Sequence, residues 1–196
     1  MAQSRSSACD VAPRRPAEIL ALTETGNNLG EPVSALPPGE PADATTVVEI
    51  NDAIRTMEAC LNNGDWLRTY ALYSDRWFQR PADAYQRASI EALATASPTP
   101  IPTGLRGIIV GPWQVRMLSD GRVMAAVLLS SEDELEPDPS RTQVFIFSKD
   151  HDRWLIDENL IVVRVPHCEL PVPVAAVVGS PGSTELIGHS EINCNS

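Results

Sequence analysis

Lysine is the scarcest charged residue in this 196-residue chain: Lys149 is the only one, and 15 basic against 26 acidic side chains give a net charge of −11. A protein that binds nucleic acid needs a basic surface to displace counterions from phosphates, and the sequence shows no such basic stripe. Anionic membrane surfaces demand the same kind of patch. We therefore expect no nucleic-acid partner and no attraction to acidic lipids.

Long apolar runs and familiar catalytic motifs are also missing. No stretch approaches the roughly 18–20 apolar residues of a membrane span, so we expect no transmembrane segment. The first 15 residues, MAQSRSSACDVAPRR, lack the apolar region of a signal peptide, which taken literally predicts a cytoplasmic protein. The glycine-rich phosphate loops, the GxSxG elbow, HExxH and CxxC are absent, and we expect no cofactor.

The cysteines point to a different compartment. An even number of cysteines near the chain ends suits disulfides that tie extensions to a core in an oxidising environment. Ser7-Ala8-Cys9 also resembles the end of a lipoprotein signal. We therefore predict an extracytoplasmic protein, secreted or lipid-anchored, whose leader is missing from this chain, or a cytoplasmic one if the cysteines are reduced. The disulfide candidates, whose three pairings all stay open, are Cys9, Cys60, Cys168 and Cys194.

The C-terminal region also holds two histidines beside two of these cysteines. His167, Cys168, His189 and Cys194 are donors that zinc favours, but their spacing fits no familiar zinc finger, ribbon or knuckle. We expect no metal site.

Proline divides the chain into three regions. Residues 1–44 and 166–196 together contain ten of the 17 prolines, although the intervening region is longer. This distribution predicts an extended leader over residues 1–43 with one short helix at 16–23, a core domain over 44–165 and an irregular tail over 166–196. Within the tail, residues 172–178 are predicted to form a short edge strand.

The core changes from helical to strand periodicity. Apolar residues at three- and four-residue spacing from Val47 to Leu61 predict an amphipathic helix over 44–62. Two more helices are predicted at about 66–79 and 81–95. Four strands follow, and Gly111-Pro112 in the first is expected to form a bulge or an edge feature. The predicted fold class is α+β, with strands at 108–117, 123–130, 142–148 and 154–165 in an antiparallel meander.

Three motifs in this order resemble the nuclear transport factor 2-like superfamily, which is also described as SnoaL-like or cystatin-like. They are Asn62-Asn63-Gly64-Asp65-Trp66, Ala71-Leu72-Tyr73-Ser74-Asp75 and Arg153-Trp154-Leu155-Ile156-Asp157-Glu158. The resemblance covers residues 44–165 and implies three helices packed in a strongly curved sheet, a cone whose open end is usually a ligand pocket. It also implies a homodimer paired through the sheet. Cys9-Asp10-Val11-Ala12-Pro13-Arg14 looks like the mature N-terminus of exported bacterial members.

Carboxylates are the candidate catalytic groups, because all three histidines fall in a turn or in the tail. Asp157, inside an apolar hairpin strand, and Asp75, near the end of the second helix, are the best placed for acid–base chemistry. Burial of Asp157 would need a partner such as Arg116 or Arg106. The alternative interpretation is a structural ion pair or a helix cap.

Aromatic side chains are the candidate ligand-binding groups. They would stack on an apolar ligand inside the cone, although such residues also form ordinary cores. The candidates, with the nearby arginine, are Tyr70, Tyr73, Trp77, Tyr85, Trp113 and Arg116.

These features favour a non-catalytic domain that binds a small apolar ligand or another protein. The alternatives are a small lyase, isomerase or hydrolase using a carboxylate in the pocket, and an assembly module acting through its tail.

Overall fold

The computed structural model describes residues 9–24, 37–79, 84–134 and 142–161, and within these residues the chain is an α+β protein. A five-stranded antiparallel sheet has the order β1-β2-β3-β4-β5 and does not close into a barrel. The elements are α1 (Pro16–Glu24), β1 (Glu40–Pro41), α2 (Ala44–Asn62), α3 (Trp66–Tyr70), α4 (Asp75–Phe78), α5 (Ala84–Thr95), β2 (Gly107–Met117), β3 (Val123–Ser131), β4 (Thr142–Asp150) and β5 (Arg153–Ile161).

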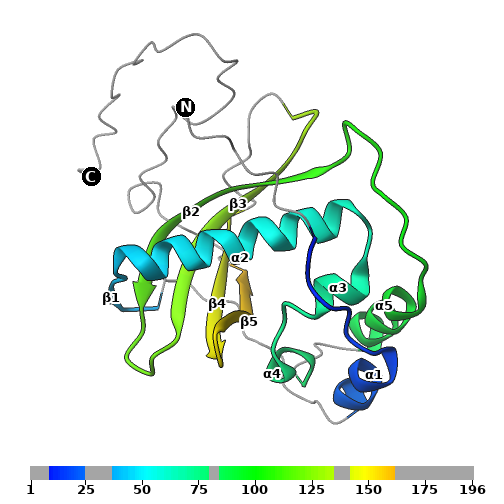
Figure 1. The fold of residues 1–196 in the computed structure, drawn as a ribbon, viewed down its shortest axis with the longest axis horizontal. Coiled ribbons are helices and arrows are strands. Elements are labelled where there is room, and N and C mark those ends of the chain that lie inside the picture. The colour runs from blue at the N-terminus through cyan, green and yellow to red at the C-terminus, as the bar shows by residue number, and fades with distance from the viewer. Residues whose placement is uncertain (1–8, 25–36, 80–83, 135–141, 162–196) are drawn as a thin grey trace.

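Helix α2 lies across one face of the sheet, and the predicted helix at 44–62 is confirmed (Figure 1). Asp43 caps its N-terminus by accepting a hydrogen bond from the Thr46 N–H at 2.9 Å. Its C-terminal turn is followed by Gly64 at φ +60°, where a Cβ atom would lie 2.0 Å from the Thr99 carbonyl oxygen. The buried side chains of α2 form a stripe that faces the sheet: Thr46, Ile50, Ile54, Met57 and Cys60.

The four predicted strands are confirmed as a meander, with small shifts at their ends. The pairing of β2 with β3 is irregular on both sides of Trp113, as expected from Gly111-Pro112. The sequence prediction missed β1, whose Glu40 and Pro41 pair with Met117 and Arg116. Two residues, one of them a proline, carry no strand periodicity, so only the pairing with β2 defines this element.

Strand β3 is buried on both faces, as its continuous apolar run indicates. Because successive side chains of a strand point to opposite faces, its residues divide between two clusters. Val123, Ala125 and Val127 pack with the buried residues of α2 in the main cluster, whereas Met124 and Ala126 belong to a second cluster on the opposite face. This second cluster also contains Leu118, Val144, Ile146 and Leu160.

The predicted second helix at 66–79 is wrong in one respect: it is broken into α3 and α4. Between them, the chain lies alongside β5, where the Ser74 N–H donates to the Ile156 carbonyl at 2.9 Å and the Ile156 N–H donates to Leu72 at 2.8 Å. Ser74 then caps α4 through its hydroxyl oxygen. These bonds to a strand some 80 residues away replace the helical bonds that local periodicity predicts.

Helix α1 lies beside α3, α4 and α5 at one side of the sheet (Figure 1). A third cluster of side chains, the helical cluster, joins these four helices. Ile19 of α1 is fully buried with Tyr70, Phe78 and Ile90. The predicted short helix at 16–23 is confirmed, and it packs on the core rather than standing apart in a leader. The predicted tail, including residues 172–178, lies outside the described residues.

Candidate functional site

A pocket of about 290 Å³ lies between the C-terminal half of α2 and the face of the sheet that α2 covers. Its volume is at the small end of the range typical for ligand sites, about 300–1,000 Å³. Apolar side chains make up most of the wall. The described apolar lining residues are Met57, Leu61, Ile108, Ile109, Leu129 and Phe145.

The polar side chains around the pocket mostly bond to one another or to the backbone. Asn62 brackets Gly107, donating to its carbonyl at 2.8 Å and accepting from its N–H at 2.9 Å. Gln143 and Asn159 share a hydrogen bond of 3.1 Å across β4 and β5. Glu58 forms a 2.8 Å ion pair with Arg55 on α2. The pocket is therefore an apolar recess with a satisfied polar rim.

Tyr73 is the polar exception among the lining residues, because its hydroxyl donates a hydrogen bond to a sulfur. The phenol oxygen lies 3.6 Å from Sδ of Met57, which lines the same pocket. Burial, with a smaller contribution from Tyr70, raises the pKa of Tyr73 above its usual value. The phenol therefore stays protonated at neutral pH and presents a hydrogen-bond donor.

Of the aromatic candidates whose side chains the structure describes, only Tyr73 lines this pocket. Tyr70 and Trp77 pack in the helical cluster, where Tyr70 meets Phe78 edge to face at 5.4 Å between ring centroids. Trp113 packs against the cluster on the opposite face of the sheet. Arg116 pairs through its backbone with Pro41 and Met124 and does not appear among the described lining residues. The side chain of Tyr85 lies outside the described residues.

Asp157 is buried, with 3% of its surface exposed. The predicted partners Arg116 and Arg106 are wrong. Oδ1 accepts from the Ser74 hydroxyl at 2.8 Å, and Oδ2 pairs with Arg122 at 3.0 Å and Arg76 at 3.3 Å. Arg106 instead donates to the Ile101 carbonyl.

The two arginines also bind neighbouring carboxylates. Glu158 contacts both Arg76 and Arg122, and Asp120 pairs with Arg122 at 2.7 Å. Burial alone would lower the pKa of Arg122, but hydrogen bonds to Glu158, Asp120 and Asp157 raise it above the usual arginine value. This cluster joins the β2–β3 turn, β5 and α4, and its geometry is that of a structural ion-pair network.

Asp75 lies at the first turn of α4 and not at the end of a long helix. Its side chain is 67% exposed and pairs with Arg14. The guanidinium of Arg14 also donates to the Tyr73 carbonyl at 3.1 Å and lies 4.8 Å from the centroid of Phe78. Neither Asp75 nor Asp157 is among the residues that line the pocket.

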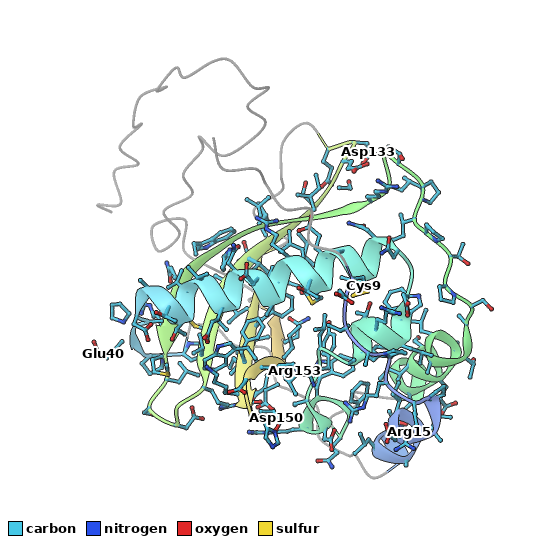
Figure 2. All side chains as sticks on the ribbon, in the orientation of Figure 1. Cys9, Arg15, Glu40, Asp133, Asp150 and Arg153 are labelled. Carbon is cyan, nitrogen blue, oxygen red and sulfur yellow. A yellow bond between two sulfur atoms is a disulfide. The ribbon has the colours of Figure 1, made fainter. Side chains whose placement is uncertain are left out.

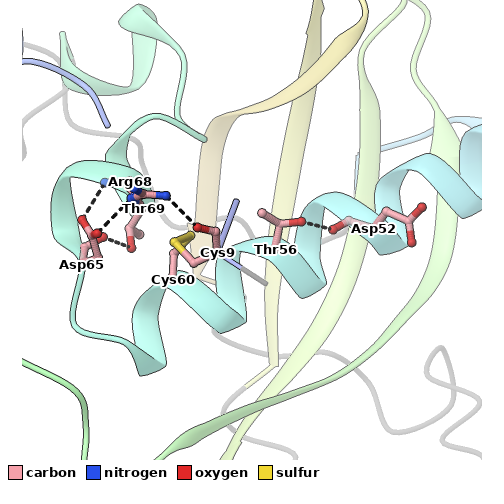
Figure 3. Close-up of a disulfide and its surroundings, with 7 residues drawn as sticks. All are labelled: Cys9, Asp52, Thr56, Cys60, Asp65, Arg68 and Thr69. Carbon is pink, nitrogen blue, oxygen red and sulfur yellow. Dashed lines mark hydrogen bonds and ion pairs between the residues drawn. A yellow bond between two sulfur atoms is a disulfide. The ribbon is translucent and has the colours of Figure 1, made fainter. Parts of the chain in front are cut away.

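A disulfide joins Cys9 to Cys60, which lies in the buried stripe of α2 (Figure 2; Figure 3). Arg68 of α3 supports the same junction by donating to the Cys9 carbonyl at 3.0 Å, while pairing with Asp65 (Figure 3). The bridge fastens the predicted leader to the core, as the cysteine positions suggested. Cys168 and Cys194 lie outside the described residues, as do His167 and His189.

Within the described ranges, no group of three or more His, Cys, Asp or Glu side chains is arranged to hold a metal ion. His151 lies in an exposed turn, bonded to the adjacent Asp150. No helix in the described part of the chain is both long and apolar enough to cross a membrane.

Comparison with known proteins returned no match for this chain among protein-family models, curated proteins or solved structures.

The residues that define the pocket were mostly missed by sequence reasoning. Met57 and Leu61 are predicted as core positions of a helix, and nothing in their spacing marks them as the wall of a recess. The one local signal is Gly107 at the start of β2, because a glycine in a strand leaves unfilled space on one face.

Proposed function

We propose that this protein is a non-catalytic domain, exported from a bacterial cell, that binds a small apolar ligand in the pocket between α2 and the sheet. The apolar wall of this pocket carries the proposal. The carboxylates considered for catalysis lie elsewhere, in ion pairs with arginines. A compact molecule of one or two rings or a short alkyl chain suits the volume.

The proposal includes membership of the nuclear transport factor 2-like superfamily. Helices followed by an antiparallel meander, with the longest helix across one sheet face, support it. A strongly curved sheet around α2 would make the pocket the narrow interior of a cone. Pairing of two chains through the sheet, protein binding and assembly through the tail stay predictions, which light scattering on the full chain and on a chain lacking residues 166–196 would test.

Export is supported by the Cys9–Cys60 disulfide, because such bonds persist in oxidising compartments. Mass spectrometry after alkylation of the native protein would test it. Cys9 and Cys60 should resist alkylation until a reductant is added. Four alkylatable thiols in protein purified from its native cells would refute the assignment.

Ligand binding is testable by filling the pocket. A Cβ atom at Gly107 would meet only Asn62 Oδ1, at an ordinary contact distance of 3.9 Å. Gly107→Leu should therefore occupy the recess with little disturbance of the sheet. The probe is indane, a neutral bicyclic hydrocarbon, and the readout is the methyl NMR spectrum of the isoleucine, leucine and methionine side chains.

In the wild-type chain, indane should shift the methyl signals of Met57, Leu61, Ile109 and Leu129. Gly107→Leu should abolish these shifts. Val48→Leu is the matched control, because Val48 is 60% exposed on α2 and does not line the pocket. Shifts that survive Gly107→Leu, or no shifts in the wild type, would refute the proposed site.

A further inference from the structure

We infer that the pocket selects an uncharged apolar ligand with one oxygen acceptor, such as a ketone, which accepts a hydrogen bond from the Tyr73 phenol. This inference rests on the proposed function and specifies the class of ligand.

The donor is poorly matched by the acceptor that the protein itself provides. A buried tyrosine hydroxyl normally finds a hydrogen-bond partner. The partner here is the Met57 thioether at 3.6 Å, and thioether sulfur is a weak acceptor. A ligand oxygen at the same wall would replace a weak hydrogen bond with a strong one, so a carbonyl gains more from this site than a hydrocarbon does.

The ring is held in place from several sides. The Trp77 ring packs against it at 4.5 Å between centroids, and Tyr70 meets it edge to face at 6.3 Å. Its backbone carbonyl accepts from Arg14, and its backbone forms an isolated bridge to Ile156 of β5. A donor fixed by packing loses little conformational entropy when it binds.

The charges argue for a neutral ligand. The described lining residues include no Lys, Arg or His, and the one charged member, Glu58, is an anion paired with Arg55. A carboxylate ligand would therefore be desolvated in an apolar recess with no cation on its wall, which is costly. On the rim, the Asn62 amide donates to Gly107 and the Asn159 amide donates to Gln143, whereas the Tyr73 hydroxyl donates to a thioether.

The test compares three ligands of one shape: 1-indanone, indane and indane-1-carboxylate. Dissociation constants are measured by NMR titration of the full chain. The wild type should bind 1-indanone about fivefold more tightly than indane, the gain expected from one net hydrogen bond. The carboxylate should bind more weakly than either.

Tyr73→Phe removes only the hydroxyl. It should bring the affinities for 1-indanone and indane together while leaving that for indane unchanged. Tyr70→Phe is the matched control, because it removes a hydroxyl from the neighbouring ring outside the pocket and should preserve the preference. A preference that survives Tyr73→Phe, or tighter binding of the carboxylate, would overturn the inference.

The inference and the proposed function fail in different ways. Equal binding of ketone and hydrocarbon by the wild type would overturn the inference and leave the pocket as a binding site. Binding of neither would overturn both. If Tyr73→Phe does not fold, Met57→Leu serves instead: it removes the competing sulfur at similar volume and should keep or enlarge the preference for the ketone. The infrared carbonyl stretch of bound 1-indanone should fall in frequency, and an unshifted stretch would also overturn the inference.

Discussion

The Cys9–Cys60 disulfide should be a major contributor to the stability of this fold. Cys9→Ala opens a loop that spans a sequence separation of 51 residues. The chain-entropy relation for a loop of this length gives about 4 kcal/mol at 25 °C, through restriction of the unfolded chain. Cys60 is left unchanged in this variant because it is fully buried in the main cluster, where a substitution would add a packing cost.

Urea denaturation would measure the effect. For a denaturant slope of about 2 kcal/mol/M, a loss of 4 kcal/mol lowers the midpoint by about 2 M. The comparison belongs in a background where Cys168 and Cys194 are alanine, so that no other thiol can pair with Cys60. Adding a reductant to the parent should reproduce the shift, and should leave the midpoint of Cys9→Ala unchanged.

A loss below about 1 kcal/mol would refute the reasoning, because the loop-closure cost would then be compensated in the unfolded chain. An unchanged methyl spectrum of the folded variant is also expected. Arg68 bonds to the backbone carbonyl of residue 9, which the substitution retains.

Four further predictions concern individual residues. In urea denaturation, Gly64→Ala should destabilise the protein by about 1–3 kcal/mol more than Gly121→Ala. Both glycines have positive φ, but only a Cβ atom at Gly64 would clash with the Thr99 carbonyl. Equal losses of unfolding free energy in the two variants would contradict this reasoning. Asp157→Ala should lower the free energy of unfolding by about 2 kcal/mol, because it removes the partner of the Ser74 hydroxyl and of two arginines. Asp120→Ala removes a half-exposed carboxylate and should lower it by less than about 1 kcal/mol. A larger loss for Asp120→Ala than for Asp157→Ala would be inconsistent with the ion-pair network. Burial raises the pKa of Tyr70 to about 12, above the ordinary value of 10.0. The stability that the protonated Tyr70 phenol contributes is therefore complete below pH 10 and is lost as the pH rises through 12. The urea midpoint should fall over this pH range, and it should fall less in Tyr70→Phe. Hydrogen bonds from the Trp154 indole and Lys149 lower the pKa of Glu49. The stability contributed by the Glu49 carboxylate is therefore present above the usual glutamate pKa and is lost as the pH falls through the pKa of Glu49 in the folded protein. The Trp154 indole N–H resonance should report this protonation of Glu49, and Glu49→Gln should remove the pH-dependent change.

The parts of the fold that depend on local pattern were predictable. The periodicity from Val47 to Leu61 predicts α2, and the apolar run after Gly121 identifies a strand buried on both faces. The break between α3 and α4 was not predictable in this way. It depends on the pairing of Ser74 with Ile156, and no residue between 66 and 79 reveals that partner.

The candidate site illustrates the same limit. Burial of Asp157 follows from its apolar neighbours, but its partner Arg122 is set by how β3, β4 and β5 align. Aromatic residues are predicted to be buried, but their positions in the sequence do not show which cluster they join. The sequence therefore could not show that Tyr73, and not Tyr70 or Trp77, lines the pocket. The recess is the space left between α2, the strands β2 to β5 and the segment that carries Tyr73, and no single segment encodes it.

Tyr73 and Trp77 pack against both the main cluster and the helical cluster. The main cluster and the helical cluster therefore meet at the rings of Tyr73 and Trp77. A change in the packing volume of one cluster must act on the other through these two rings. Ile19 does not line the pocket, yet it belongs to the cluster that sets the position of the Tyr73 ring. Substitutions in α1 thus offer a way to tune the recess from outside it, without altering any side chain that a ligand would touch.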